Sequence, residues 1–279
     1  MIFLIEGRLR LIREPAVAGQ FYLASATSLR NQIEEFIDID AQKIEAKGVV
    51  LPHAGYIYSG AVAGKTISSV NIPQTCVILG PNHTGLGSNF SIMTEGTWAT
   101  PLGNVEIDKE LATKILSSSK FLKQDFSAHR YEHSLEVEIP FLQYFKKSCK
   151  IVPIVASVGN LDTYRAIGKE ISSAIKALSK EKEVLIIASS DMTHYEPQDQ
   201  ARKKDFEAID AVLKLDEELL LKKIRSLDIS MCGFAPVVIM LSCIKELGAN
   251  QARLVMYQTS GDVTKDYSSV VGYAGIVLN

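Results

Sequence analysis

Short apolar segments and longer amphipathic segments alternate along most of the 279-residue chain. The short segments are rich in β-branched residues and end at Gly, Pro or Ser, which is typical of buried strands. The longer segments repeat their apolar residues every three or four positions, which is typical of helices with one buried face. The predicted helices are residues 27–37, 60–70, 108–117, 134–145, 161–178, 200–213, 217–225 and 234–247; the predicted strands precede His53 and His83 or cover residues 90–94, 151–156, 184–188, 253–258 and 269–278.

Strands that alternate with helices predict an α/β fold, in which helices flank a mostly parallel central sheet. The last two strands have a short polar connection through Gly261 and Asp262, so we expect them to be antiparallel and to make the sheet mixed. No proline- or serine-rich linker and no long block of charge interrupts the chain. A single domain is therefore the simplest interpretation.

Composition and charge narrow the classes of partner. Hydrophobic residues make up 47% of the chain and charged residues 22%, so the protein can bury a full core. The formal net charge of −2 gives no electrostatic reason to expect nucleic acid or an anionic membrane as a partner. The apolar start is too short for a signal peptide, and no run approaches the ~18 apolar residues of a membrane span. We therefore expect a cytoplasmic protein.

Three of the five histidines follow predicted strands directly. His53, His83 and His194 each lie in the turn that closes an apolar run. In open α/β sheets, ligands bind at the carboxyl ends of the strands, so these imidazoles should lie at one edge of the sheet. Any one of them alone would more simply be a loop histidine with a structural hydrogen bond. Together they outline a metal site.

Cys232 is a further candidate ligand, because it stands in a predicted turn, Ser-Met-Cys-Gly-Phe, before a helix. The other three cysteines lie in apolar surroundings and are expected to be small buried side chains: Cys76, Cys149 and Cys243. Two imidazoles and a thiolate would suit iron, copper or zinc over magnesium or calcium. Three protein ligands would leave a position open for water or substrate.

The remaining candidates adjoin these residues in sequence. Asp191 lies three residues before His194, a spacing that suits a general base and its carboxylate partner, a ligand-supporting pair, or simply a helix cap. His133 lies in Glu132-His-Ser-Leu-Glu and can face the same crevice, while Glu132 or Ser134 can cap the following helix. His129 stands in a polar stretch and is predicted to be exposed and without a role.

Seven segments, in this order along the chain, are similar to the signature blocks of the Memo family, the mediators of receptor-driven cell motility and their archaeal and bacterial relatives. They are Pro15-Ala-Val-Ala-Gly-Gln-Phe-Tyr, Pro52-His-Ala-Gly-Tyr-Ile-Tyr-Ser-Gly, Gly80-Pro-Asn-His, Thr97-Trp-Ala-Thr-Pro-Leu-Gly, Glu132-His-Ser-Leu-Glu, Ser189-Ser-Asp-Met-Thr-His and Met231-Cys-Gly. The resemblance implies a Memo-like α/β domain over residues 15–279, preceded by an N-terminal extension of residues 1–14.

The resemblance also implies a fold like that of class III, LigB-type extradiol dioxygenases, which hold non-haem iron with two histidines and a glutamate. On that pattern His53 and His83 match the histidine ligands, Cys232 matches the glutamate, and His194 matches the catalytic histidine with Asp191 as its acidic neighbour. Residues adjoining these positions, Tyr56, Asn82 and His133, are expected to line the pocket or support the ligands. One metal ion, iron or copper with zinc as a further option, is the implied cofactor.

The change from carboxylate to thiolate limits what the resemblance implies about activity. A thiolate is softer than a carboxylate and can itself be oxidised, so ring cleavage does not carry over, although metal binding does. Family association adds a radical-SAM protein and a small companion domain as partners, besides an unidentified small-molecule or peptide ligand.

Three functions follow as hypotheses. The first is a metalloprotein with a His/His/Cys pocket and metal-dependent redox activity. The second is a non-catalytic module that binds a peptide or an anion in the inherited pocket, which the lack of an arginine cluster disfavours. The third is a metal-assisted hydrolase, because a metal-bound water beside a general base can also attack a substrate and hydrolyse it.

Overall fold

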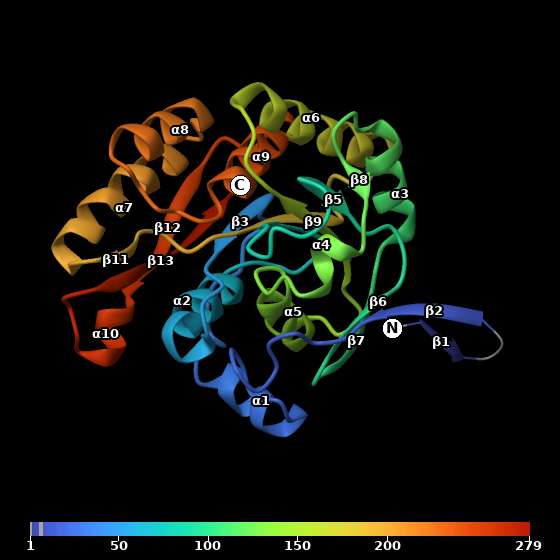
Figure 1. The fold of residues 1–279 in the computed structure, drawn as a ribbon, viewed down its shortest axis with the longest axis horizontal. Coiled ribbons are helices and arrows are strands. Elements are labelled where there is room, and N and C mark those ends of the chain that lie inside the picture. Colours follow the sequence, from blue (N-terminus) through green and yellow to red (C-terminus); the bar gives the residue numbers. More distant parts are fainter. Residues whose placement is uncertain (1, 6–7) are drawn as a thin grey trace.

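A nine-stranded mixed sheet runs through the centre of the protein in the computed structural model, which describes residues 2–5 and 8–279 (Figure 1). Its strands follow one another in the order β11 (His194–Glu196), β13 (Val270–Leu278), β3 (Gly48–Leu51), β10 (Val184–Ser189), β4 (Thr75–Pro81), β9 (Lys150–Ala156), β5 (Phe90–Ile92) and β8 (Lys123–Gln124), with β12 (Ala252–Thr259) paired to β13.

The middle of this sheet is parallel, and the next strand on each side pairs antiparallel with it. Strands β3, β10, β4 and β9 run in the same direction, whereas β13 and β5 pair antiparallel with the outer members of this group. The residues of β3, β4 and β10 are buried throughout, as expected for parallel strands covered on both faces. The predicted mixed α/β fold is confirmed and is consistent with a LigB-like architecture.

Helices cover both faces of the sheet. Figure 1 shows one group along the upper side of the molecule and another below it. The upper group comprises α3 (Lys109–Ser118), α6 (Leu161–Ala177), α8 (Glu217–Ser226) and α9 (Phe234–Glu246). The lower group comprises α1 (Ala26–Glu34), α2 (Tyr56–Ser68) and α5 (Ile139–Phe145), while α7 (Gln198–Leu213) packs on β12 and β13. None of the helices in the described part of the chain has the length and apolarity needed to cross a membrane.

A smaller sheet lies beside the main one and was not predicted. It contains β1 (Ile2–Ile5), β2 (Arg8–Arg13), β6 (Thr97–Thr100) and β7 (Gly103–Glu106), in that order. Strand β2 pairs in parallel with β6 at Ile12 and Arg13. The described end of the N-terminal extension is therefore joined to the rest of the protein by a strand pairing that local sequence patterns do not reveal.

Several predicted elements differ from those observed. The helix predicted at 60–70 begins earlier, at Tyr56. The helix predicted at 134–145 is a 3-10 turn, Glu136–Glu138, followed by α5, and neither Glu132 nor Ser134 caps it because both side chains bond elsewhere. The turn between β12 and β13 holds a short helix, α10 (Ser260–Thr264).

The prediction that His129 is exposed is wrong, because this side chain, in α4 (Ser127–Arg130), is fully buried. Its two ring nitrogens lie 2.9 Å from the carbonyl oxygen of Asp125 and 3.2 Å from that of Pro153. Polar neighbours in sequence indicate a surface position, but here the ring lies between two backbone segments and, because burial keeps it neutral, donates its single proton to one of the two carbonyl oxygens. The predicted burial of Cys76, Cys149 and Cys243 is confirmed.

Buried Glu136 fixes the entry of the chain into the domain. Its carboxylate forms an ion pair with Arg13, whose side chain is also fully buried. It also accepts hydrogen bonds from the backbone N–H of Ala16 at 2.8 Å and Val17 at 3.1 Å, and from the Tyr22 hydroxyl at 2.6 Å. One carboxylate thus holds the segment that leads from β2 toward α1.

Replacement of this carboxylate should destabilise the protein strongly. In Glu136→Gln the buried guanidinium of Arg13 loses its counter-charge, so the free energy of unfolding should fall by about 3 kcal/mol or more. Denaturant unfolding followed by circular dichroism measures this. The matched control is Glu95→Gln, which removes the exposed pair with Lys109 and should cost less than about 1 kcal/mol. An equal loss of unfolding free energy in the two variants would contradict the stabilising role given to Glu136.

Candidate metal centre

The carboxyl ends of three neighbouring strands bring the predicted site residues together. In the parallel register of β3, β10 and β4, the strands end at Leu51, Ser189 and Pro81, and their following turns carry His53, Asp191 and His83. The ring centroids of His53 and His83 lie 5.1 Å apart. The expectation that strand ends gather the three histidines at one edge is therefore met for His53 and His83, and His194, which begins the short strand β11, lines the same cavity.

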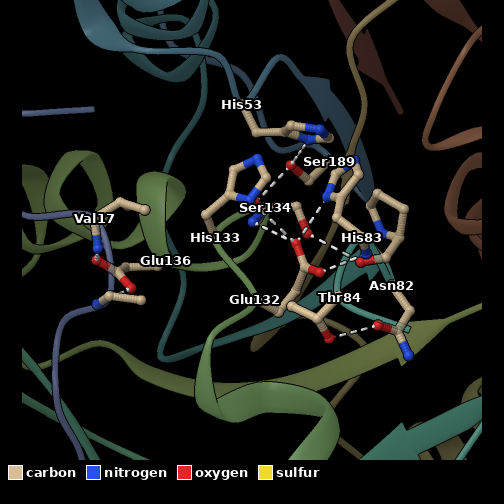
Figure 2. Close-up of polar contacts among 12 residues, drawn as sticks. Val17, His53, Asn82, His83, Thr84, Glu132, His133, Ser134, Glu136 and Ser189 are labelled. Atoms are coloured by element: carbon tan, nitrogen blue, oxygen red, sulfur yellow. Dashed lines mark hydrogen bonds and ion pairs between the residues drawn. The ribbon is translucent and has the colours of Figure 1, made fainter. Parts of the chain in front are cut away.

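His133 completes a group of three imidazoles (Figure 2). Its ring stacks on that of His83 at a centroid distance of 4.7 Å and lies edge-on to His53 at 5.5 Å. One ring nitrogen from each of these three histidines lies within 4.8 Å of the other two, so among the described residues they form a group that could hold a metal ion.

Glu132 orients His83. This buried carboxylate accepts the backbone N–H of His83 at 2.6 Å and lies 2.9 Å from its Nδ1. Burial alone would raise the pKa of Glu132, but the hydrogen bonds that it accepts from His83 and from the backbone N–H of Ser134 outweigh burial and lower the pKa to about 2. An ionised carboxylate can only accept, so Nδ1 of His83 carries the proton and Nε2 keeps a free lone pair. The same carboxylate lies 3.6 Å from Nδ1 of His133.

His53 is the buried member of the group. Its Nδ1 lies 2.8 Å from Oγ of Ser189, and its Nε2 lies 3.2 Å from Sγ of Cys232. Burial, followed by the charges of the neighbouring histidines, lowers the pKa of His53, so its ring is neutral at pH 7. Burial, followed by the charge of Asp191, raises the pKa of Cys232, so without a metal the sulfur is a thiol.

Asp191 and His194 do not bond through their side chains. The Asp191 carboxylate accepts the backbone N–H of His53 at 2.8 Å, and burial raises its pKa to about 6. The carbonyl oxygen of Ser230 lies 3.0 Å from Nδ1 of His194 and can only accept, so Nδ1 is protonated and Nε2 is free. Asp191 thus supports the turn at His53, and Ser230 sets the tautomer of His194.

A cavity of about 320 Å³ opens onto the imidazoles. Besides the site residues it is lined by aromatic side chains, Phe21, Tyr58, Tyr195 and Tyr273. Tyr56, which we expected at the pocket, instead lies in the core, where its hydroxyl donates to the Val137 carbonyl at 2.6 Å. Asn82 lines a second cavity of about 390 Å³, which reaches Cys232 and His83 from another side.

Sequence reasoning missed the roles of Glu132, Ser189 and Ser230. The position of Glu132 before a predicted helix indicates a cap, although an acidic residue directly before His133 is also a signal that a carboxylate lies near the imidazoles. Ser189 directly follows the strand predicted at 184–188, and Ser230 lies two residues before Cys232. No local pattern distinguishes these serines from ordinary turn residues, because their partners are distant in sequence.

Comparison with known proteins shows the family of this chain. The family model described as "Memo-like protein" matches residues 13–277. A MEMO1 family protein of Methanopyrus kandleri is 44% identical over 280 residues, covering 95% of this chain and 98% of its own. MEMO1 family proteins of Methanothermobacter thermautotrophicus and Aquifex aeolicus are each 43% identical, covering 95% and 96% of this chain and 99% of their own. This chain therefore belongs to the Memo family.

Proposed function

We propose that this protein binds one transition-metal ion through His53, His83 and Cys232 and uses it for redox chemistry on a small molecule in the adjoining cavity. The observation that carries the proposal is that ring nitrogens of His53 and His83 lie within 4.8 Å of each other while Sγ of Cys232 lies 3.2 Å from Nε2 of His53. Both His83 and His194 have Nδ1 committed to an acceptor, which leaves Nε2 free to bind a metal or a proton.

The donor set fits a soft or borderline metal. Metal–nitrogen and metal–sulfur bonds of about 2.1 and 2.3 Å at a tetrahedral ion place the two donor atoms roughly 3.6 Å apart. The observed 3.2 Å between Nε2 of His53 and Sγ of Cys232 is close to that spacing. Metal binding would deprotonate the thiol, and the backbone N–H of Asp191, 3.3 Å from Sγ, would stabilise the thiolate. Iron or copper, with zinc as an option, suits this set.

Cys232 and His133 compete for the third ligand position. His133 belongs to the group of converging imidazoles, but it stacks on His83 and lacks a close acceptor at Nδ1, with Glu132 at 3.6 Å. Cys232 makes the closer contact with His53. We therefore assign Cys232 as the ligand and His133 to the pocket wall.

The remaining groups have roles in binding and proton transfer. When bound, the metal supplies Lewis acidity or electron transfer at an open position. His194 lines the cavity, and its Nε2 keeps a lone pair with which it can take a proton from a bound molecule. Among its described lining residues the cavity contains no lysine or arginine, and Asp191 adds negative charge at neutral pH, so an anionic ligand is disfavoured.

Substitution of Cys232 or of His133 should show which of the two is the third metal ligand beside His53 and His83. Cobalt(II) bound to the wild type should show the near-ultraviolet charge-transfer band of a cobalt–thiolate bond, and Cys232→Ala should lose it. His133→Ala should keep the band and bind the metal with similar affinity. Loss of binding in His133→Ala with an unchanged spectrum in Cys232→Ala would contradict the assignment, and no binding by the wild type would refute the proposed function.

Removal of the carboxylate behind His83 should weaken the site. Glu132→Gln should lower metal affinity about 10- to 100-fold, because the charge that fixes and polarises His83 is lost. Competition with a chromophoric chelator measures this affinity. The control is Glu217→Gln, which changes a buried acid at the start of α8 that pairs with Arg165 and Lys245, and it should leave the affinity unchanged.

The same variant has a pH signature in the metal-free protein. The pKa of Glu132 is about 2 in the folded chain against an ordinary 4.5, so its carboxylate stabilises the fold above pH 4.5. That contribution is lost as the pH falls toward 2. The difference in unfolding free energy between wild type and Glu132→Gln should therefore shrink between pH 4.5 and 2; a constant difference would contradict the low pKa.

Substitution of the proposed base, His194, should affect turnover without affecting metal binding. His194→Gln should keep the bound metal but slow turnover by about 10²- to 10⁴-fold, as expected when a general base is removed. Oxygen uptake by the iron-loaded protein with catechol-like substrates is the assay for redox chemistry. Hydrolysis without oxygen uptake would favour a hydrolase instead, and loss of metal from His194→Gln would make this residue a ligand.

A further inference from the structure

Glu138 is a buried carboxyl group that the proposed metal site does not use. It closes the 3-10 turn Glu136–Glu138, and its side chain is fully buried. Its Oε1 lies 2.8 Å from Oγ of Ser189, whereas its Oε2 has no hydrogen-bond partner among the described residues. An ionised carboxylate with one buried oxygen unpaired would carry a large desolvation cost. The unpaired, buried Oε2 therefore favours a protonated, neutral Glu138 over the ionised carboxylate.

The number of donors and acceptors around the Ser189 hydroxyl determines whether Glu138 is protonated. Its Oγ has three close polar neighbours, namely the carbonyl oxygen of Ser134 at 2.7 Å, Oε1 of Glu138 at 2.8 Å and Nδ1 of His53 at 2.8 Å. A serine hydroxyl has one proton to donate and two lone pairs that accept. A backbone carbonyl can only accept, so the single proton of Ser189 lies toward Ser134.

The other two contacts must then be donations to Oγ of Ser189. Two oxygens 2.8 Å apart with no proton between them would repel each other, so Glu138 carries a proton on Oε1. By the same count, His53 carries its proton on Nδ1. Every donor and lone pair of the Ser189 hydroxyl is then satisfied, and Nε2 of His53 is left unprotonated on the side of Cys232.

The surroundings favour the neutral acid. Asp191, in the turn after β10, is the titratable group that acts on Glu138, and Glu138 in turn acts on the buried hydroxyl of Tyr56 from α2. Neither supplies positive charge, and the guanidinium of Arg13 is committed to Glu136. Burial, followed by the charge of Asp191, raises the pKa of Glu138 even though Ser189 acts in the opposite direction.

We propose that Glu138 is a permanently protonated carboxylic acid that, through Ser189, holds His53 in the tautomer with Nε2 free. It is a positioning residue two hydrogen bonds from the site, and its importance for metal affinity rests on the function proposed above. The required group at this position is a neutral hydrogen-bond donor rather than a negative charge. This is the opposite of Glu132, which serves His83 as an ionised acceptor.

Infrared difference spectroscopy tests the protonation state without any metal. At pH 8, where Asp191 is ionised, the wild type should show the carbonyl stretch of a protonated carboxylic acid, which shifts in D₂O and is absent from Glu138→Gln. The control Glu217→Gln should retain the band, because Glu217 is ionised by Arg165 and Lys245. Absence of a band that depends on Glu138 would overturn the proposal.

Metal affinity tests the positioning role. Glutamine also donates to Ser189, so Glu138→Gln should bind zinc within about threefold of the wild type, whereas Glu138→Leu should bind it about 10- to 100-fold more weakly. Equal weakening by both substitutions would mean that a charge is needed and would overturn the proposal. If Glu138→Leu does not fold, Ser189→Ala replaces it, because it removes the acceptor of the His53 proton and should weaken binding by a similar factor.

The tautomer of His53 provides a readout that survives failure of the metal hypothesis. In metal-free protein, nitrogen-15 shifts should show His53 protonated at Nδ1 in both the wild type and Glu138→Gln. Protonation at Nε2 in either protein would overturn the inference. If the wild type binds no zinc, the function proposed above fails, while the infrared band and these shifts still decide the state of Glu138.

Discussion

Three buried carboxyl groups within seven residues, Glu132, Glu136 and Glu138, organise the site and its surroundings. Each is bonded to a different part of the chain: Glu132 to the turn after β4, Glu136 to the N-terminal segment, and Glu138 to the end of β10 through Ser189. Burial of carboxyl groups is costly unless their oxygens are bonded or a proton removes the charge. The segment can therefore take up its place only when those three partners are correctly assembled around it.

The cost of burying each of these three carboxyl groups is offset by a different interaction. Glu136 is neutralised by the guanidinium of Arg13, and Glu132 is stabilised as an anion by hydrogen bonds from His83 and Ser134. Glu138 has no such partner, and a proton takes the place of a counter-ion. One short segment thus supplies an ion pair, an anionic acceptor and a neutral donor, and the last two fix opposite sides of the histidine group.

The chemistry of the site follows from this arrangement. His53 is buried and neutral, His83 is polarised by an anion, and Cys232 is a thiol in the metal-free protein. These differences make the donors unequal, so a metal bound here would have one strongly polarised imidazole and one soft thiolate beside an aromatic cavity. A site of this kind suits redox metals better than hard ions such as magnesium.

The sequence by itself determined the α/β fold, the strands that end at His53 and His83, and the family, because buried strands and amphipathic helices depend on local periodicity and the motifs are contiguous. It did not predict the smaller sheet, the burial of His129 or the partners of Glu132 and Glu138. Those features depend on contacts between residues that are far apart in the chain, such as Ser189 with Glu138 and Arg13 with Glu136. Only the tertiary structure decides which buried polar groups meet and which atom keeps the proton, because hydrogen-bond partners are assigned by position in space and not by distance along the sequence.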